Sequence, residues 1–585
     1  MIVLGLSALY HDSACALMVD GKLVGAAQEE RFTRRRFDPQ MPVRAVRACL
    51  RDAGIRIQDI DHVAYYEDPV RKLGRQLWMG LPQAPAASPE TLYRLDAHRP
   101  LRQIEELIGY SGEVTCVQHH EAHAASAFYQ SGFAEAALFT ADAVGEWTTT
   151  SYGRGHAEGV SLFEEVDFPH SLGILYSAVT SYLGFAVNSD EYKVMGLAPY
   201  GTARYVEQLR DLVIGLPHGQ YRLNMKYFDV SGTSSMFTPA LGELLGAPPR
   251  DPESEVLQFH SDVASSVQAL LEEVLLDKLV YLHEATGSDR LCYAGGVALN
   301  CVANRRIRER GPFGEVFVQP AAGDAGGAIG AAALVSHRLT GVHRPERIRD
   351  VRVGPKPELR SVRGWLDAAG VPYLDFAGDE SALAERASEW LDEGKVLGWF
   401  QGRMEFGPRA LGARSILADP RRADMRDHIN ALVKKREAFR PFAPAVVAER
   451  CAEFFELEGA SPFMLDTANV REPDALPAIT HVDGSARVQT VDSTDNPRFH
   501  ALLAAFGRRT GYPILLNTSF NMRGEPIVSG AADALACFVR SRLDVLVLDD
   551  LAIRAVDLPA HWLTQVDQQL PYRQPVISRD VYTFL

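Results

Sequence analysis

Hydrophobic and polar positions along the first part of the chain follow two periods. Short apolar runs bounded by Gly or Asp predict buried strands, and apolar positions three or four residues apart predict helices. Strands are expected at residues 2–7, 14–20, 23–28, 136–141, 148–154, 291–294 and 316–319. Helices are expected at residues 43–53, 171–185, 259–284 and 326–335. Asp20 and Gly21 between the second and third strands are a strong hairpin signal, and the mixture predicts an α/β protein.

One local pattern occurs twice. Asp12 lies in a loop between a strand and a hairpin, and Asp142 follows residues 136–141 ahead of residues 148–154. A strand, an Asp-bearing loop and a hairpin resemble the arrangement with which actin-like ATPases hold nucleotide phosphates and metal. We therefore expect an internal duplication. The alternative is that Asp is simply a good turn former after a strand.

A second domain is expected beyond a basic, proline-bearing stretch at residues 338–357. There the pattern predicts a helix at 381–393 and strands at 396–400 and 543–548. The expected domains are residues 1–345 and 355–585. Within the first, two stretches with little period, 69–100 and 217–257, are expected to be irregular excursions that shape a substrate pocket. The mixed charge run at 29–36 predicts a solvated face.

Composition narrows the function classes. A length of 585 residues suggests two or more domains, and 46% hydrophobic with 23% charged residues is typical of a soluble globular protein. The net charge of −15 argues against a nucleic-acid partner. The longest apolar runs fall short of the roughly 20 residues of a membrane span, so no membrane association is expected. Without a basic N-terminal region or a CxxC pair, the chain is expected to be cytoplasmic, with its seven cysteines reduced.

Two histidines and two aspartates form a candidate metal set. His119 and His123 are four residues apart, so one helix would place both rings on one face. Asp142 follows a predicted buried strand, and Asp324 lies in a glycine-rich turn. Two imidazoles and two carboxylates suit a transition metal better than calcium, which prefers oxygen ligands. The alternative for the two histidines is a polar helix face or a hydrogen bond in the core.

Anion-binding features occur in both predicted domains. Gly295 and Gly296 come between a strand and a helix, which lets backbone N–H groups approach an anion, and Lys193 beside a Gly- and Pro-bounded loop is a candidate phosphate partner. A solvated lysine is the alternative there. In the second domain, cations lie among Gly and Pro residues, where Arg forks match phosphate oxygens. The alternative is that these cations pair with neighbouring acids. The cations are Arg409, Lys434, Arg440, Arg487 and Arg523.

Six motifs in one order carry a family resemblance. They lie at residues 119–123, 142–147, 191–201, 295–300, 406–412 and 517–521. Together they resemble the O-carbamoyltransferases of the nodulation-protein-U and cephamycin type, which include antibiotic-tailoring enzymes. One departure is Ala143, where the family motif leads us to expect glycine. The resemblance covers essentially the whole chain.

The resemblance implies two folds. The first domain is expected to be a duplicated ribonuclease-H-like, actin-like ATPase domain, and the second a YrdC-like α/β domain. It also implies site residues. His119, His123, Asp142 and Asp324 correspond to metal ligands, with iron(II) or another divalent metal expected, and ATP is expected with magnesium. ATP contacts are expected from Lys193, Gly295, Gly296, Asn300 and Asp324. Carbamoyl phosphate is expected at Arg409, Lys434, Arg440, Arg487, Asn517 and Arg523.

The expected function is ATP-dependent O-carbamoyl transfer. Carbamoyl phosphate and ATP would give carbamoyl-adenylate, and the carbamoyl group would pass to a hydroxyl of a natural product, a sugar of a macrolide or aminoglycoside antibiotic. Asp12, His119 and Arg440 are the expected catalytic residues. A homodimer is one assembly that the resemblance allows. Two alternatives are an RNA-modifying enzyme of the threonylcarbamoyl-adenosine type and a non-catalytic actin-like nucleotide-binding regulator.

Overall fold

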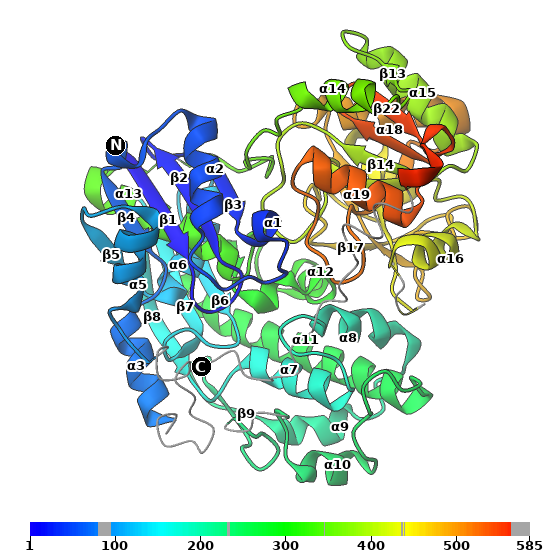
Figure 1. Cartoon of the computed structure of the whole chain (residues 1–585). Coiled ribbons are helices and arrows are strands. Elements are labelled where there is room, and N and C mark those ends of the chain that lie inside the picture. Colours follow the sequence, from blue (N-terminus) through cyan, green and yellow to red (C-terminus); the bar gives the residue numbers. More distant parts are fainter. Residues whose placement is uncertain (80–94, 231–234, 344, 435–436, 438, 563–585) are drawn as a thin grey trace. The chain divides into compact units, whose positions relative to one another are not determined.

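The structure is a computed structural model that describes residues 1–79, 95–230, 235–343, 345–434, 437 and 439–562 (Figure 1). The described chain divides into two compact units. Among the described residues, the first consists of Met1–Thr33 and Phe37–Ile348, and the second of Arg34–Arg36 and the chain from Arg349 to residue 562. None of the described helices is both long enough and apolar enough to cross a lipid bilayer.

The first unit contains two five-stranded sheets with the same strand order (Figure 1). In each, the first strand pairs antiparallel with the second and parallel with the fourth. The first sheet has the order β3 (Lys22–Gln28), β2 (Ala14–Val19), β1 (Ile2–Ser7), β4 (His62–Tyr65), β5 (Val114–Cys116). The second has the order β8 (Gly159–Asp167), β7 (Thr148–His156), β6 (Ala136–Ala141), β11 (Arg290–Ala294), β12 (Glu315–Val318). The matching orders confirm the predicted duplication and the actin-like fold class.

Two helices pack against each other and against the two sheets. α13 (Asp324–Thr340) contacts β1 and β2, and α6 (His119–Ser131) contacts β6, β7 and β11. Small residues make this packing close, because a Cβ atom on Gly330 would overlap the backbone of Ala122. The remaining predicted helices of this unit are confirmed as α2 (Val43–Ala53), α7 (Leu172–Tyr182) and α11 (Gln258–Thr286).

The second unit is built on a mixed eight-stranded sheet. Its order is β13 (Leu374–Asp375), β22 (Leu551–Arg554), β21 (Val545–Leu548), β14 (Leu397–Phe400), β15 (Arg414–Ala418), β20 (Ile514–Ser519), β16 (Ala443–Val447), β19 (Gln489–Val491). α15 (Glu380–Asp392) and α18 (Pro497–Thr510) share one core cluster with the sheet, and α19 (Ala531–Ser541) belongs to a second. This is an α/β unit, as predicted. Its YrdC-like character stays a prediction.

Three local predictions need correction. The charge run is a solvated face only at Arg35 and Arg36, which are exposed, because Glu29, Glu30 and Arg31 are buried. Glu29 accepts backbone N–H bonds from Arg44 and Ala45, which stabilises the start of α2. The excursion at 69–100 begins with the helix α3 (Pro69–Trp78) and ends at the start of α5 (Arg99–Gln103), while 80–94 lies outside the described residues. The excursion at 217–257 contains β10 (Tyr221–Leu223) and α10 (Pro239–Leu245) and is otherwise irregular where it is described, with 231–234 outside the description.

Candidate metal and nucleotide site

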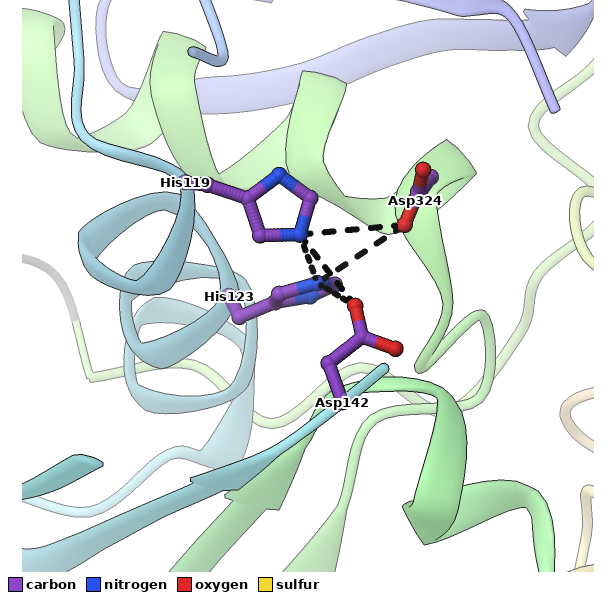
Figure 2. A group of neighbouring side chains, drawn as sticks. All are labelled: His119, His123, Asp142 and Asp324. Carbon is purple, nitrogen blue, oxygen red and sulfur yellow. Dashed lines mark hydrogen bonds and ion pairs between the residues drawn. The ribbon is translucent and has the colours of Figure 1, made fainter. Parts of the chain in front are cut away.

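The predicted metal set converges in the first unit. His119 and His123 are the first and fifth residues of α6, which places both rings on one face, and their Nε2 atoms lie 2.9 Å apart. Asp142 directly follows β6, and its Oδ2 lies 3.2 Å from His119 Nε2 and 3.0 Å from His123 Nε2. Asp324, the first residue of α13, places Oδ1 3.8 Å and 4.0 Å from the same two nitrogens (Figure 2).

The donor geometry fits a transition metal. The four ligand atoms lie within 4.8 Å of one another, and all four residues are buried. Ligand atoms about 2.0–2.2 Å from one ion are separated from one another by roughly 3–3.5 Å, close to the shorter spacings here. Among the described residues, Asp324 Oδ2 is a buried oxygen without a hydrogen-bond partner, so this carboxylate has capacity for a further ligand. Two imidazoles with two carboxylates is a donor set that divalent transition metals favour.

The four side chains of the cluster shift one another's pKa values strongly. Burial lowers the pKa of His119, but the hydrogen bond to Asp142 and the charge of Asp324 outweigh burial and raise this pKa to about 9. Burial raises the pKa of Asp324 to about 7. Burial acts to raise the pKa of Asp142 as well, yet the hydrogen bonds to His119 and His123 hold it well below its usual range. A metal ion at this place would displace protons that the cluster otherwise holds.

The predicted phosphate loop touches the metal set. Gly295 follows β11 and has a φ of 94°, a conformation that favours glycine. A Cβ atom there would overlap the carbonyl oxygen of Ala141. The N–H of Gly296 donates to Asp142 Oδ1 at 3.2 Å, and the N–H of Ala143 donates to the same oxygen at 2.8 Å. Asp142 Oδ1 is therefore held by the backbone, which leaves Oδ2 for the cluster.

Two other predicted ATP residues already have protein partners. Asn300 is the N-cap of α12 (Cys301–Arg310), since its Oδ1 accepts from Ala303 N at 3.0 Å, and it also bonds to Gln268. Lys193 is buried, and its Nζ lies 2.9 Å from Asp190 Oδ2. Their ATP contacts stay predictions.

Asp12 lies near the cluster. It adopts a left-handed conformation with a φ of 49°, and its charge contributes to the raised pKa of Asp324, for which burial is the main cause. His11 Nδ1 lies 3.8 Å from Asp12 Oδ2. Ser7 Oγ, at the end of β1, donates to the carbonyl oxygen of Asp12 at 3.2 Å, which places Asp12 at the carboxyl end of that strand.

The predicted carbamoyl-phosphate residues lie in the second unit, where the segments that carry Arg409, Arg440 and Arg487 meet at Asn517. Asn517 Nδ2 donates to Gln489 Oε1 at 2.8 Å and to the carbonyl of Ala410, next to Arg409. Asn517 is also paired with Ala443 in the sheet, three residues after Arg440. Arg487 ends β18 (Ser485–Arg487), two residues before Gln489. Arg523 follows β20 in the chain, and the side chain of Lys434 lies outside the described residues.

Sequence reasoning missed two buried carboxylates that hold site loops in place. Glu146 accepts from the backbone N–H of His119 at 3.0 Å and of Asp68 at 2.6 Å, which satisfies the first turn of α6. Glu405 Oε1 accepts from the N–H groups of Leu411, Ala413 and Arg414. The only sequence signal was the position of each acid inside or directly before a motif, because its partners are distant in sequence or on the backbone.

Known proteins match this chain over most of its length. A family model described as Carbamoyltransferase N-terminus matches residues 2–77 and 104–333, and one described as Carbamoyltransferase C-terminus matches residues 388–555. An uncharacterized protein of Synechocystis is 42% identical, over 95% of this chain and 97% of its own. Nodulation protein NolNO of Sinorhizobium fredii is 40% identical, over 93% of this chain and 79% of its own. The 3'-hydroxymethylcephem-O-carbamoyltransferase of Amycolatopsis lactamdurans is 33% identical, over 63% of this chain and 65% of its own.

Proposed function

The chain belongs to the carbamoyltransferase family of enzymes, and from this premise we propose that it carries out ATP-dependent O-carbamoyl transfer. Carbamoyl phosphate is the donor, and a hydroxyl of a small-molecule natural product is the acceptor. The observation that carries the proposal is the direct bond between the glycine loop and the metal set, from Gly296 N–H to Asp142 Oδ1. It links a phosphate-binding device to a cation site, as adenylation of a substrate requires.

The second unit would bind carbamoyl phosphate. Its candidate contacts are Arg409, Arg440, Arg487 and Arg523, on segments that meet around Asn517. Among the described residues, Asn517 Oδ1 is a buried acceptor without a partner, which suits the N–H₂ group of a carbamoyl ligand. Water cleaves the donor there to carbamate and phosphate. Carbamate is unstable, so the site must exclude bulk water.

The first unit would bind ATP and the metal. Carbamate oxygen attacks the α-phosphorus of ATP, and carbamoyl-adenylate and pyrophosphate are formed. The N–H groups of Gly295 and Gly296 already donate to Ala322 and Asp142, so the glycine loop would serve the phosphates by letting them approach a backbone without side chains. His119, His123, Asp142 and Asp324 would hold a divalent transition metal, with iron(II) as our proposal, and the bound metal would supply charge neutralisation for the phosphates. Magnesium would accompany the nucleotide.

The acceptor stage would use the Asp12 loop. The acceptor hydroxyl attacks the carbamoyl carbon, the C–O bond to AMP breaks, and the proton passes to Asp12 as general base. The products are the O-carbamoylated acceptor and AMP. A sugar hydroxyl of a macrolide or aminoglycoside antibiotic is our proposed acceptor. A cephem carbamoyltransferase among the relatives supports an antibiotic acceptor.

The test separates the two stages. Arg440→Ala is expected to abolish pyrophosphate formation from ATP and carbamoyl phosphate, whereas added carbamoyl-adenylate is still converted to AMP at the wild-type rate. Arg450→Ala, which removes an exposed arginine paired with Glu453 in the same unit, is the matched control and should retain both activities. Loss of both activities in Arg440→Ala would contradict two separate sites.

A further inference from the structure

Helix α3 buries its polar residues and exposes its apolar residues, which is the reverse of an ordinary surface helix. Surface helices turn their apolar residues to the core and their polar residues to water. Here Val70, Leu77 and Trp78 are 67%, 53% and 62% exposed. Lys72, Arg75 and Gln76 have exposed fractions of only 9%, 0% and 2%. Burial of polar groups is costly unless protein partners or a ligand form hydrogen bonds with them. The buried side chains on the inner face of α3 therefore need polar partners.

Arg75 accounts for part of that face. Its Nε donates to the carbonyl oxygen of Glu146 at 2.5 Å, and Glu146 in turn holds the first turn of α6. Arg75 therefore fixes α3 against the loop that positions His119. Lys72 lies one turn before Arg75 and Gln76 directly follows it, and both line a different part of the inner face.

Lys72 and Gln76 line a narrow pocket between α3, α5 and the end of β4. Lys72 Nζ forms a buried ion pair with Glu67 Oε2 at 2.9 Å. The polar residues of the lining are Glu67, Lys72, Gln76, Asp96 and Arg99. Two carboxylates balance two cations, so the pocket has no net charge to attract a phosphate. Buried groups that donate and accept, without net charge, match the hydroxyls of a neutral ligand, each of which also donates and accepts.

The pocket adjoins the candidate site. Leu9, two residues beyond β1, and Glu67, two residues beyond β4, both line it, so it opens at the sheet edge that carries Asp12. Ligands of open α/β sheets bind at this carboxyl edge. Tyr10 lies between the pocket and the metal set. Lys72 Nζ is 4.8 Å from its ring centroid, and the pKa of Tyr10, raised mainly by burial, is raised further by the charges of Asp324 and Asp142.

We propose that the pocket lined by Glu67, Lys72 and Gln76 is the acceptor subsite, and that its free volume of about 30 Å³ takes one or two hydroxyls at the edge of a neutral, hydroxyl-rich ring such as a hexose unit. The assignment deepens the proposed function and rests on it for the word acceptor. Glu67 accepts from one ring hydroxyl, Lys72 donates to another, and Gln76 does both. Because these groups are buried, a ring without hydroxyls would displace water from them, would return no hydrogen bonds, and would be rejected.

The experiment measures ring binding by the full chain with saturation-transfer NMR. The probes are methyl glucopyranoside, methyl mannopyranoside and methyl galactopyranoside, with tetrahydropyran as the ring that lacks hydroxyls. Wild type is expected to bind at least one hexoside at millimolar concentration and not tetrahydropyran. Gln76→Leu should weaken hexoside binding about tenfold or more. Leu77→Gln, a polar change on the exposed side of the same turn, should leave it unchanged.

A second variant keeps the test decisive if Gln76→Leu does not fold. The double variant Glu67→Gln with Lys72→Met removes both charges at once and avoids a buried unpaired ion. It too should lose hexoside binding about tenfold while it keeps a cooperative thermal transition. Binding of no hexoside by wild type, or full binding by folded Gln76→Leu or by the folded double variant, would overturn the subsite.

Pyrophosphate formation from ATP and carbamoyl phosphate, measured in the same proteins, separates this inference from the proposed function. Wild type that binds a hexoside but forms no pyrophosphate would contradict the proposed function and would still support the sugar subsite. Wild type that forms pyrophosphate but binds no hexoside would support the proposed function and would contradict the sugar subsite.

Discussion

The backbone N–H of Gly296 donates to Oδ1 of Asp142 at 3.2 Å. The two residues are 154 positions apart in sequence. Asp142 directly follows β6, and Gly296 comes one residue after Gly295, which directly follows the neighbouring parallel strand β11. The bond fixes one oxygen of Asp142 and points the other at His119 and His123. A change in the glycine loop should therefore disturb the metal set as well as the nucleotide.

Removal of one imidazole should empty the metal site. His123→Ala is expected to weaken binding of a divalent transition metal about 100-fold or more, because loss of a residue that only hydrogen-bonds to a metal ligand already costs about 10–100-fold. Metal content of the purified protein, measured by elemental mass spectrometry, checks this. His283→Ala, a histidine on α11 outside the cluster, is the control and should bind metal as wild type does. Equal metal content in both variants would count against the four-residue set.

Gly295 should tolerate no side chain. Its φ of 94° and ψ of 160° lie in a region that is essentially restricted to glycine, and an added Cβ would overlap Ala141. Gly295→Ala is expected to lower the free energy of unfolding by about 3 kcal/mol or more. Gly287→Ala is the matched control, since Gly287 also has a positive φ, 63°, but open space around it, and about 1 kcal/mol is expected there. Chemical denaturation measures both, and equal losses would show that the overlap is irrelevant.

Glu146 should act through the two N–H groups that it accepts. Glu146→Ala leaves the buried N–H of His119 and of Asp68 without an acceptor, which is expected to cost roughly 2–4 kcal/mol of stability and to weaken metal binding. Glu146→Gln keeps a carbonyl oxygen in the same place and should recover most of both. A Gln variant as damaged as the Ala variant, in melting and in metal titration, would mean that the negative charge matters rather than the hydrogen bonds.

Glu29 should make stability depend on pH. Burial raises its pKa from 4.5 to about 6. The folded protein therefore holds this proton more tightly than the unfolded chain, and the ionised form is penalised in the fold. As pH falls from 7 through 6 towards 4.5, wild type should gain stability relative to Glu29→Gln, which does not titrate. Denaturation of both proteins across this range checks the sign, and a difference that stays constant with pH would refute it.

The sequence could predict the metal set because each ligand has a local signal. His119 and His123 are one helical turn apart, and Asp142 directly follows a buried strand. The duplication was predictable for the same reason, since the strand, the Asp-bearing loop and the hairpin recur as one local pattern at Asp12 and at Asp142. The long-range contacts that complete the site carry no such signal. Glu146 accepts the N–H of His119, 27 positions away, and no local pattern in either segment predicts that the two are in contact.

Helix α3 shows why one element was missed. Helix prediction depends on apolar residues that face the core. In α3 the residues that face inward are Lys72, Arg75 and Gln76. The helical period is present, but polar residues occupy the positions where apolar residues are expected. Its N-terminal signals, Asp68 as N-cap and Pro69 at the first position, were present in the sequence. The prediction of a solvated face at 29–36 failed at Glu29 for a similar reason. Glu29 is buried and accepts hydrogen bonds from the backbone of a different segment, at Arg44 and Ala45.

The most direct test of the central claim identifies the products of ATP by phosphorus NMR. Wild type with carbamoyl phosphate, ATP and metal should form AMP and pyrophosphate, and the pyrophosphate should depend on carbamoyl phosphate. His123→Ala should form neither product. Formation of ADP and phosphate instead, or of pyrophosphate without carbamoyl phosphate, would contradict adenylation of carbamate at the site of His119, His123, Asp142 and Asp324.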